Sequence, residues 1–287
     1  MRLTVTAPMT FAWEDLAAVA PGPGEVRVRT HLSALSVSSE LAVAQRGPFP
    51  AALGDQTLGV VDEAGANTAL QPGTRVITTL GHAAWGLHPE GRVIPIPAHV
   101  PDPVALCAVL GEETHKGLRK VAPHPGEQVL VAGAGLLGLL TVFNLTRRGF
   151  EGVTVLEPQA ERRRLALTFG AAQACAPGTL PHDAFDVGVD CSASPAGFAE
   201  LMGHLRPRGR CAVLADGNWG ALTLPPAFHT RELQLVTSSD GEDYAAYARW
   251  LWHHPESLLA GLFPVTVHPA QLPALYPRLL TSDTNSD

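Results

Sequence analysis

The chain has 287 residues, of which 46% are hydrophobic and 16% are charged, and its formal net charge is −7. This length allows two domains with separate cores, and the composition is that of a folded globular protein. An acidic surface repels phosphate groups and anionic lipids, so we expect neither a nucleic-acid nor a membrane partner. The four cysteines form no CxxC pair and the N-terminus does not read as a signal peptide, which favours reduced thiols in a cytoplasmic protein.

Short strands separated by glycine and proline turns are expected in the first hundred residues. Residues 25–30 alternate apolar and polar side chains directly after the turn Pro21–Gly24. Residues 57–63 and 74–79 show a similar pattern on either side of Pro72-Gly73. Strands of this kind predict a small β-rich domain of the barrel type.

From Pro101 onward the expected elements lengthen and alternate between helix and strand. Their order is helix 104–121, strand 128–132, helix 136–148, strand 153–156, helix 160–169, strand 185–190, helix 194–205, strand 211–214, and a helix over 244–253 before a short strand–helix tail. This alternation predicts parallel βαβ units. The uncharged stretch 128–146 is long enough for a membrane span, but its glycines favour a strand, a turn and a helix.

The most specific motif is Gly133-Ala134-Gly135-Leu136-Leu137-Gly138, which follows an expected buried strand and opens an expected helix. In such a turn the first glycine permits the sharp bend and the second lets backbone amides approach a pyrophosphate. The third lets the helix pack against the strand, and the helix N-terminus offers unpaired amides and partial positive charge. We therefore expect a dinucleotide to bind at Gly133, Gly135, Leu136, Leu137 and Gly138.

An acidic residue at the end of the next expected strand indicates which dinucleotide binds. Glu157 follows Gly138 by 19 positions, close to the spacing of about 20 at which a carboxylate binds the adenosine ribose. A carboxylate there repels a 2′-phosphate and favours NAD(H). Three arginines follow at positions 162–164, and Arg162 could reach a 2′-phosphate, which leaves NADP(H) as the alternative.

Four further segments resemble the medium-chain dehydrogenase/reductase superfamily, whose best-known members are zinc alcohol dehydrogenases. They are the stretches PGPGEV at 21–26, GTRV at 73–76, PGEQVLV at 125–131 and FDVGVDC at 185–191. The resemblance implies an α/β protein that acts on a small molecule as a homodimer or homotetramer. It also implies a GroES-like β-rich catalytic domain over 1–107, to which 240–287 returns, and a Rossmann domain with a doubly wound parallel sheet over 108–239.

The positions that carry zinc ligands in this family hold other residues here. Ser36 stands where a cysteine thiolate would lie, and Asp55-Gln56 replaces the family's His-Glu pair. The third position falls near Val109 or Leu110, and neither side chain can coordinate a metal. Because a catalytic zinc needs three protein ligands, we expect no zinc.

Without a metal, protein hydrogen bonds must stabilise charge on the substrate oxygen. Ser39 stands where the resemblance implies a relay hydroxyl, and His82 is a candidate acid or base near neutral pH. The candidate catalytic residues are Ser36, Ser39, Asp55, Gln56 and His82. Structural roles are the alternative, because loop serines commonly satisfy backbone groups.

Three functions follow from these patterns. The leading hypothesis is an NAD(H)-dependent, zinc-independent oxidoreductase that moves a hydride between nicotinamide and a small alcohol, a carbonyl or an activated alkene. The second is a zinc-dependent alcohol dehydrogenase whose site is rebuilt from Asp55, His82 and Glu112 or Glu113. The third is a catalytically inactive dinucleotide-binding sensor or scaffold, which would suit a catalytic domain trimmed of the family's last strand near Thr281.

Overall fold

The computed structural model describes residues 1–215, 221–253 and 256–284, which fall into two compact units. Unit 1 contains residues 1–109 and the described residues from Tyr244 onward. Unit 2 contains the described residues of 110–243. The two units are taken in turn below, unit 2 first.

Unit 2 is built on a sheet of six parallel strands. The strands are β9 (Val129–Ala132), β10 (Val153–Leu156), β11 (Gln173–Cys175), β12 (Phe185–Asp190), β13 (Leu205–Val213) and β14 (Gln234–Thr237), and their order in the sheet is β11-β10-β9-β12-β13-β14. Counted from the first strand of the unit, this is the order 3-2-1-4-5-6 of the dinucleotide-binding fold. The expected doubly wound parallel sheet is confirmed.

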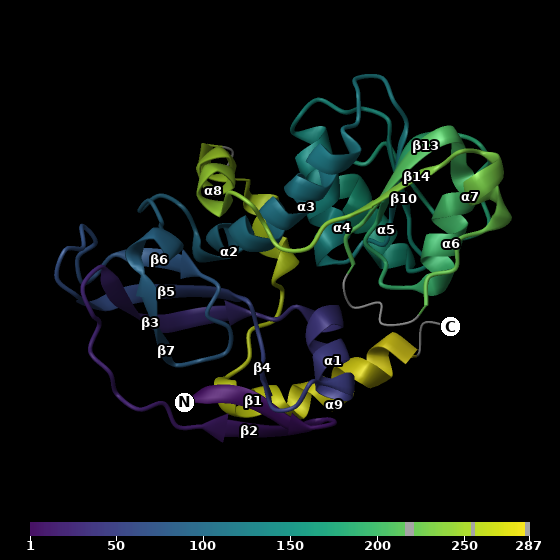
Figure 1. The fold of residues 1–287 in the computed structure, drawn as a ribbon. Helices are drawn as coiled ribbons and strands as arrows, with labels where there is room; N and C mark the ends of the chain where they lie inside the picture. Colours follow the sequence, from purple (N-terminus) through teal and green to yellow (C-terminus); the bar gives the residue numbers. More distant parts are fainter. Residues whose placement is uncertain (216–220, 254–255, 285–287) are drawn as a thin grey trace. The chain divides into compact units, whose positions relative to one another are not determined.

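Helices cover this sheet on both faces. They are α3 (Ala108–Val121, in unit 2 from Leu110), α4 (Leu136–Thr146), α5 (Ala160–Thr168), α6 (Pro195–His204) and α7 (Pro226–Thr230). Figure 1 shows α4 and α5 on one side of the strands and α6 and α7 on the other. Right-handed crossovers require this arrangement, because strand order runs in opposite directions on the two sides of β9. A fully buried apolar cluster joins α6 to the sheet. It includes Leu130 of β9 and Phe198 and Leu201 of α6.

Unit 1 contains two antiparallel sheets. The larger has the order β7-β3-β5-β6-β8, formed by β3 (Glu25–Ala34), β5 (Gln56–Ala64), β6 (Arg75–Thr78), β7 (Trp85–Pro89) and β8 (Ile94–Pro95). The smaller has the order β2-β1-β4, formed by β1 (Arg2–Ala7), β2 (Thr10–Glu14) and β4 (Ala51–Ala52). The alternation expected for 25–30 is realised in β3, where Val26 and Val28 are buried and pack with Val61.

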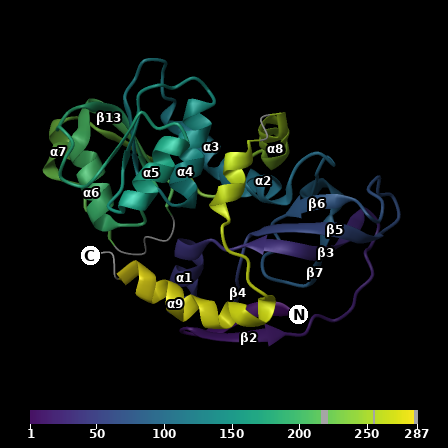
Figure 2. The ribbon, with the colours of Figure 1, turned by 180° about the vertical axis from the view of Figure 1, so that it is seen from behind.

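The helices of unit 1 are α1 (Val37–Arg46), α2 (Asp102–Leu106), α8 (Tyr244–His253) and α9 (Leu272–Thr284), with 3-10 turns η1 (Glu90–Arg92), η2 (Ser257–Leu262) and η3 (Pro269–Gln271). Figure 2 shows α9 beside α1 and the β1–β2 hairpin. The contact is apolar, because Tyr276 of α9 is fully buried with Leu3, Val5 and Leu41. A chain segment more than 200 residues away thereby completes the N-terminal core.

Three expected elements differ in the structure. The helix expected over 104–121 is broken at Cys107, whose N–H bonds to Val104 O in a tight turn that ends α2. Leu205, expected at the end of a helix, begins β13. The strand expected after the helix 244–253 is not formed in the described part of the tail, which holds 3-10 turns and α9. None of the described helices is long and apolar enough to cross a membrane.

Candidate active site

The backbone geometry of the glycine-rich loop in unit 2 explains why glycine stands at the first and third glycine positions of the motif, Gly133 and Gly138. Gly133 directly follows β9 and has a φ of +90°, and a Cβ atom there would lie 2.9 Å from the backbone oxygen of Cys191. A Cβ atom on Gly138 would lie only 1.9 Å from the Gly133 oxygen. Both positions therefore require glycine, the first for the turn and the third for the approach of α4 to the loop.

The middle glycine faces open space instead. Gly135 is the N-cap of α4, and a Cβ atom built on it would meet no described atom within 4 Å. Leu136 and Leu137 form the first turn of α4, whose leading amides have no partners within the helix. The loop thus combines an open approach with the positive end of a helix, which is the arrangement that binds phosphate groups.

Glu157 lies directly after β10 with its carboxylate bound to this loop. One carboxylate oxygen accepts a 2.8 Å hydrogen bond from the Ala134 amide, and the other accepts a 2.9 Å bond from the Gln159 amide. The side chain is 3% exposed. Arg163 donates to the Glu157 carbonyl oxygen at 2.8 Å, whereas Arg162 is exposed on α5. The structure therefore joins Glu157 to the loop and leaves Arg162 on the surface.

The two serine candidates in unit 1 lie at the start of α1 and contact each other. Ser36 is the N-cap residue of α1, and the Ser39 hydroxyl donates to the Ser36 hydroxyl oxygen at 2.7 Å. The Ser36 amide donates to Oε1 of Glu40 at 2.8 Å. Glu40 is 4% exposed, so a buried carboxylate lies directly behind the serine pair.

His82 joins the same carboxylate from the loop that follows β6. Its Nε2 lies 2.9 Å from Oε2 of Glu40, and its Nδ1 lies 2.7 Å from the hydroxyl of Ser33 on β3. Because a carboxylate only accepts, Nε2 carries a hydrogen, and in the neutral form of imidazole Nδ1 is then an acceptor for the Ser33 hydroxyl. The Tyr276 hydroxyl also donates to Oε2 of Glu40. Burial, followed by the charge of Glu40 and this hydrogen bond, raises the pKa of Tyr276.

Backbone contacts hold His82 on both sides. Its amide donates to the Leu53 oxygen at 2.9 Å, and its carbonyl oxygen accepts from the Leu3 amide at 2.8 Å. Gly54 has a φ of +88°, and a Cβ atom there would lie 2.9 Å from the His82 nitrogen. The imidazole is therefore fixed by its main chain as well as by its two ring nitrogens.

The remaining candidates lie at the start of β5. Asp55 is half-buried and directly precedes the strand, and Gln56 pairs with Ala34 of β3. The Gln56 side chain is fully buried, and neither of its amide atoms has a hydrogen-bond partner among the described residues. A buried amide of this kind is destabilising unless water or a ligand satisfies it.

Ser36, Ser39 and His82 are thus brought together by Glu40. Sequence reasoning missed Glu40, Ser33 and Tyr276. Glu40 directly follows Ser39, which the resemblance singled out, so its position was a signal that could have been used. Ser33 and Tyr276 carry no local signal, because only the tertiary fold places them beside the cluster.

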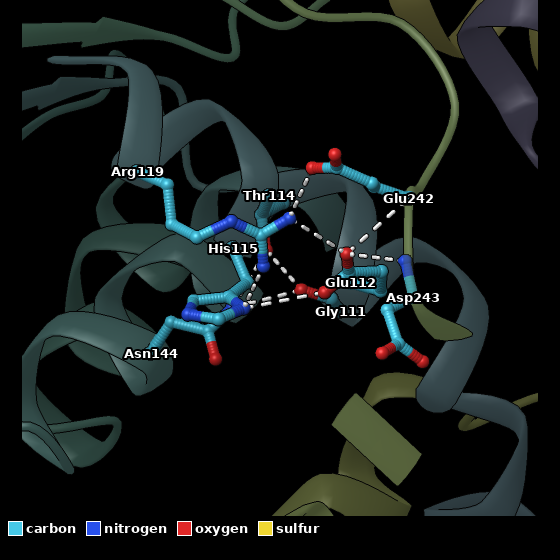
Figure 3. A network of polar contacts seen from close by, with 8 residues as sticks. All are labelled: Gly111, Glu112, Thr114, His115, Arg119, Asn144, Glu242 and Asp243. Carbon is cyan, nitrogen blue, oxygen red and sulfur yellow. Dashed lines mark hydrogen bonds and ion pairs between the residues drawn. The ribbon is translucent and has the colours of Figure 1, made fainter. Parts of the chain in front are cut away.

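Glu112, one of the two alternative glutamates proposed for a rebuilt metal site, has both carboxylate oxygens engaged within unit 2. Oε1 of Glu112 accepts from Arg119 at 3.1 Å and from the amides of Glu242 and Asp243 at 3.2 and 3.1 Å, while Oε2 lies 3.2 Å from Nδ1 of His115 (Figure 3). Over the described ranges of the chain, no group of three or more His, Cys, Asp or Glu residues is arranged to hold a metal ion.

No protein-family model matches the chain. Its sequence is similar to that of L-threonine 3-dehydrogenase from Ruegeria pomeroyi, with 28% identity over 160 residues that cover 50% of this chain and 46% of the relative. It is also similar to (R,R)-butanediol dehydrogenase from Saccharomyces cerevisiae, with 28% identity over 182 residues, 56% of this chain and 46% of the relative. The chain thus matches about half the length of these curated relatives.

A solved structure shares the fold of nearly the whole chain. A protein described as a short chain alcohol dehydrogenase from Escherichia coli CFT073, complexed with NADH, has a TM-score of 0.78 at 18% identity, and 90% of this chain covers 89% of its length. The parallel sheet, the glycine loop and these relatives point to the same kind of protein. In sequence and in fold, the chain is similar to the medium-chain dehydrogenase/reductase superfamily. In this comparison unit 2 corresponds to the Rossmann domain and unit 1 to the GroES-like domain.

Proposed function

We propose that the protein is an NAD(H)-dependent oxidoreductase of the medium-chain dehydrogenase/reductase type that transfers a hydride between nicotinamide C4 and a small alcohol, a carbonyl or an activated alkene. The observation that carries the proposal is the loop Gly133–Gly138, open at Gly135 and bonded through Ala134 to the Glu157 carboxylate. The bound nicotinamide supplies or accepts the hydride. The NADH complex of the fold relative supports this choice of cofactor class.

The surroundings of Glu157 favour NAD(H) over NADP(H). Its two oxygens each hold one backbone amide and keep further lone pairs for the hydroxyls of an adenosine ribose. A 2′-phosphate would face this carboxylate. Arg163 is bonded to the Glu157 and Pro158 carbonyl oxygens, whereas Arg162 and Arg164 are exposed on α5 and are the cations that could pair with such a phosphate.

We propose further that the reaction does not use zinc. The expected ligand positions hold the Ser36 hydroxyl, the Asp55 carboxylate and the apolar Val109 or Leu110, a donor set that does not fit catalytic zinc. Ser36, Ser39 and the unsatisfied amide of Gln56 supply polar groups for a substrate oxygen in its place. A fixed donor of this kind contributes about 3 kcal/mol to transition-state stabilisation.

Small secondary alcohols are the first substrates to consider. The curated relatives are named for L-threonine and (R,R)-butanediol, in both of which the hydroxyl that is oxidised sits on a secondary carbon. Similarity over about half of each relative supports the class of reaction rather than a particular substrate. We propose this class for the chain, acting as a homodimer or homotetramer.

Measurements of nucleotide binding, zinc content and turnover test the proposal. NADH and NADPH are titrated separately by energy transfer from the five tryptophans, zinc content is measured on the same sample, and NAD⁺ reduction is followed with a panel of secondary alcohols. We expect NADH to bind at least about tenfold more tightly than NADPH, a difference of about 1.4 kcal/mol, with no stoichiometric zinc and with turnover of an alcohol.

Other outcomes favour the other functions. Stoichiometric zinc, with activity lost on chelation, would establish the zinc dehydrogenase with atypical ligands. Tight NADH binding without turnover of any alcohol or carbonyl would establish the sensor or scaffold. Failure of both nucleotides to bind would overturn the oxidoreductase proposal.

A further inference from the structure

The imidazole of His82 is buried, and both of its nitrogens are occupied. It is 3% exposed, with Nε2 bonded to Glu40 and Nδ1 bonded to Ser33. Neither nitrogen is available to contact a substrate directly. If His82 takes part in acid–base chemistry, its proton must therefore pass through Ser33 or Glu40.

The two side chains that are bonded to the ring differ in burial. Glu40 is buried, and its carboxylate accepts from three donors, namely the Ser36 amide, the Tyr276 hydroxyl and His82. Ser33 is half-buried on β3, and its hydroxyl lies 2.7 Å from Nδ1. With a neutral imidazole the hydrogen bonds run from Ser33 to His82 to Glu40, and Ser33 is the least buried of the three.

A series of hydrogen bonds from a hydroxyl through an imidazole to a carboxylate enables the hydroxyl to transfer a proton. A hydroxyl bonded to an imidazole can lose its proton to the ring as it accepts a proton from another group. A carboxylate on the far nitrogen fixes the tautomer and stabilises the imidazolium that forms. The three donors keep the Glu40 charge in place, so the imidazolium forms beside a satisfied partner instead of as an isolated buried charge.

We propose that Ser33 is a catalytic residue that passes the hydroxyl proton of the substrate to His82, with His82 and Glu40 acting through it. This inference rests on the proposed oxidoreductase function. In alcohol oxidation the carbinol C–H bond breaks as its hydride forms a C–H bond at nicotinamide C4. The alcohol proton moves to Ser33 Oγ while the Ser33 proton moves to Nδ1 of His82, and the O–H electron pair becomes the second bond of the carbonyl. Water later takes the proton from His82 through Ser33.

The main alternative is a purely structural network that ties β3, α1 and α9 together. The two roles differ in what the Ser33 hydroxyl does. A structural bond contributes to stability in proportion to its burial, whereas a relay hydroxyl affects kcat with little effect on KM or on cofactor binding. Ser33 and His82 would also act as a unit, so that removing both would cost no more than removing one.

The test uses the full chain with NAD⁺, (R,R)-2,3-butanediol and L-threonine. The variants are Ser33→Ala, Ser33→Thr, His82→Gln, the double variant Ser33→Ala/His82→Gln, and Thr30→Val as the matched control. Thr30 is half-buried on the same strand, and its hydroxyl has no partner among the described residues. Every variant is checked for NADH binding and thermal midpoint.

We expect Ser33→Ala to lower kcat by about 100-fold or more, the range of general acid–base catalysis, with KM and NADH affinity changed less than about threefold. Ser33→Thr should recover kcat to within about tenfold, Thr30→Val should match the wild type, and the double variant should be no slower than His82→Gln. A kcat of Ser33→Ala within about threefold of wild type would overturn the relay, as would equal losses in Ser33→Ala and Thr30→Val. If the wild type binds NADH but oxidises neither alcohol nor the wider panel, the proposed function fails and the relay falls with it.

Discussion

Glu112 is a buried carboxylate of unit 2 whose charge is held by several hydrogen bonds. Its side chain is 1% exposed, and it connects the start of α3 to the backbone of Glu242 and Asp243 (Figure 3). The chain enters unit 2 at Leu110 and leaves it at Asp243, so this carboxylate joins the two ends of the unit. Burial opposes its charged form, but hydrogen bonds from His115, Asp243, Arg119 and Glu242 prevail and lower the pKa of Glu112 to about 2.

The lowered pKa of Glu112 determines how much this side chain stabilises the folded state and how that stabilisation depends on pH. A pKa lowered from 4.5 to about 2 corresponds to roughly 3 kcal/mol of stability at neutral pH, since one unit is about 1.4 kcal/mol. Because the folded-state pKa is depressed, this stability is fully present above about pH 4.5 and is lost as the pH falls toward 2. We expect Glu112→Gln to lower the free energy of unfolding by about 2–3 kcal/mol at pH 7, and by progressively less below pH 4.5.

Denaturant unfolding of the full chain, followed by circular dichroism between pH 7 and pH 3.5, measures this difference. Glu242→Gln is the matched control, because Glu242 also pairs with Arg119 at 3.0 Å but its side chain is 69% exposed. A surface pair of this kind contributes at most about 1 kcal/mol. A loss below about 0.5 kcal/mol for Glu112→Gln at pH 7, or a loss that does not shrink on acidification, would refute the reasoning.

Two further substitutions test the polar groups of unit 1. Gln56→Met removes two buried amide atoms that have no partner among the described residues. We therefore expect an unchanged or higher thermal midpoint, together with at least tenfold slower turnover. A clear loss of stability would contradict this. Tyr276→Phe keeps the aromatic ring, whose centroid lies 4.6 Å from that of Phe11, but removes a hydrogen-bond donor to the buried Glu40. We expect the free energy of unfolding, measured with denaturant, to fall by about 1.5–3 kcal/mol. An unchanged free energy would show that this hydrogen bond contributes nothing to stability.

The Rossmann half of the fold was predictable because its signals are local. The strand 153–156 and the helix 160–169 were each bounded by glycine or charge patterns, and the structure places β10 and α5 within one residue of them. The glycine loop carries its own geometric requirement, since a side chain at Gly133 or Gly138 would collide with backbone. Such requirements appear in the sequence as residue types at a fixed spacing.

Unit 1 was less predictable because its contacts join residues that are far apart in the sequence. The Tyr276 hydroxyl reaches Glu40 across 236 positions, and the Ser33 hydroxyl contacts His82 across 49. No periodicity encodes such pairs. The helix α1 was missed for a local reason, since Ser36, Ser38 and Ser39 at its start can bond the backbone in turns as readily as in a helix.

The central claim is that the Gly133–Gly138 loop holds the cofactor, and Gly135→Ala tests it most directly. The added methyl meets no described atom within 4 Å and the backbone φ of −76° accepts alanine, so folding should be preserved. The methyl would instead enter the space in which we place the pyrophosphate. Gly91→Ala is the control, because that glycine also faces open space but lies in unit 1. The account predicts NADH binding at least about tenfold weaker for Gly135→Ala, at an unchanged thermal midpoint, and wild-type binding for Gly91→Ala. Equal NADH affinity in the two variants would contradict it.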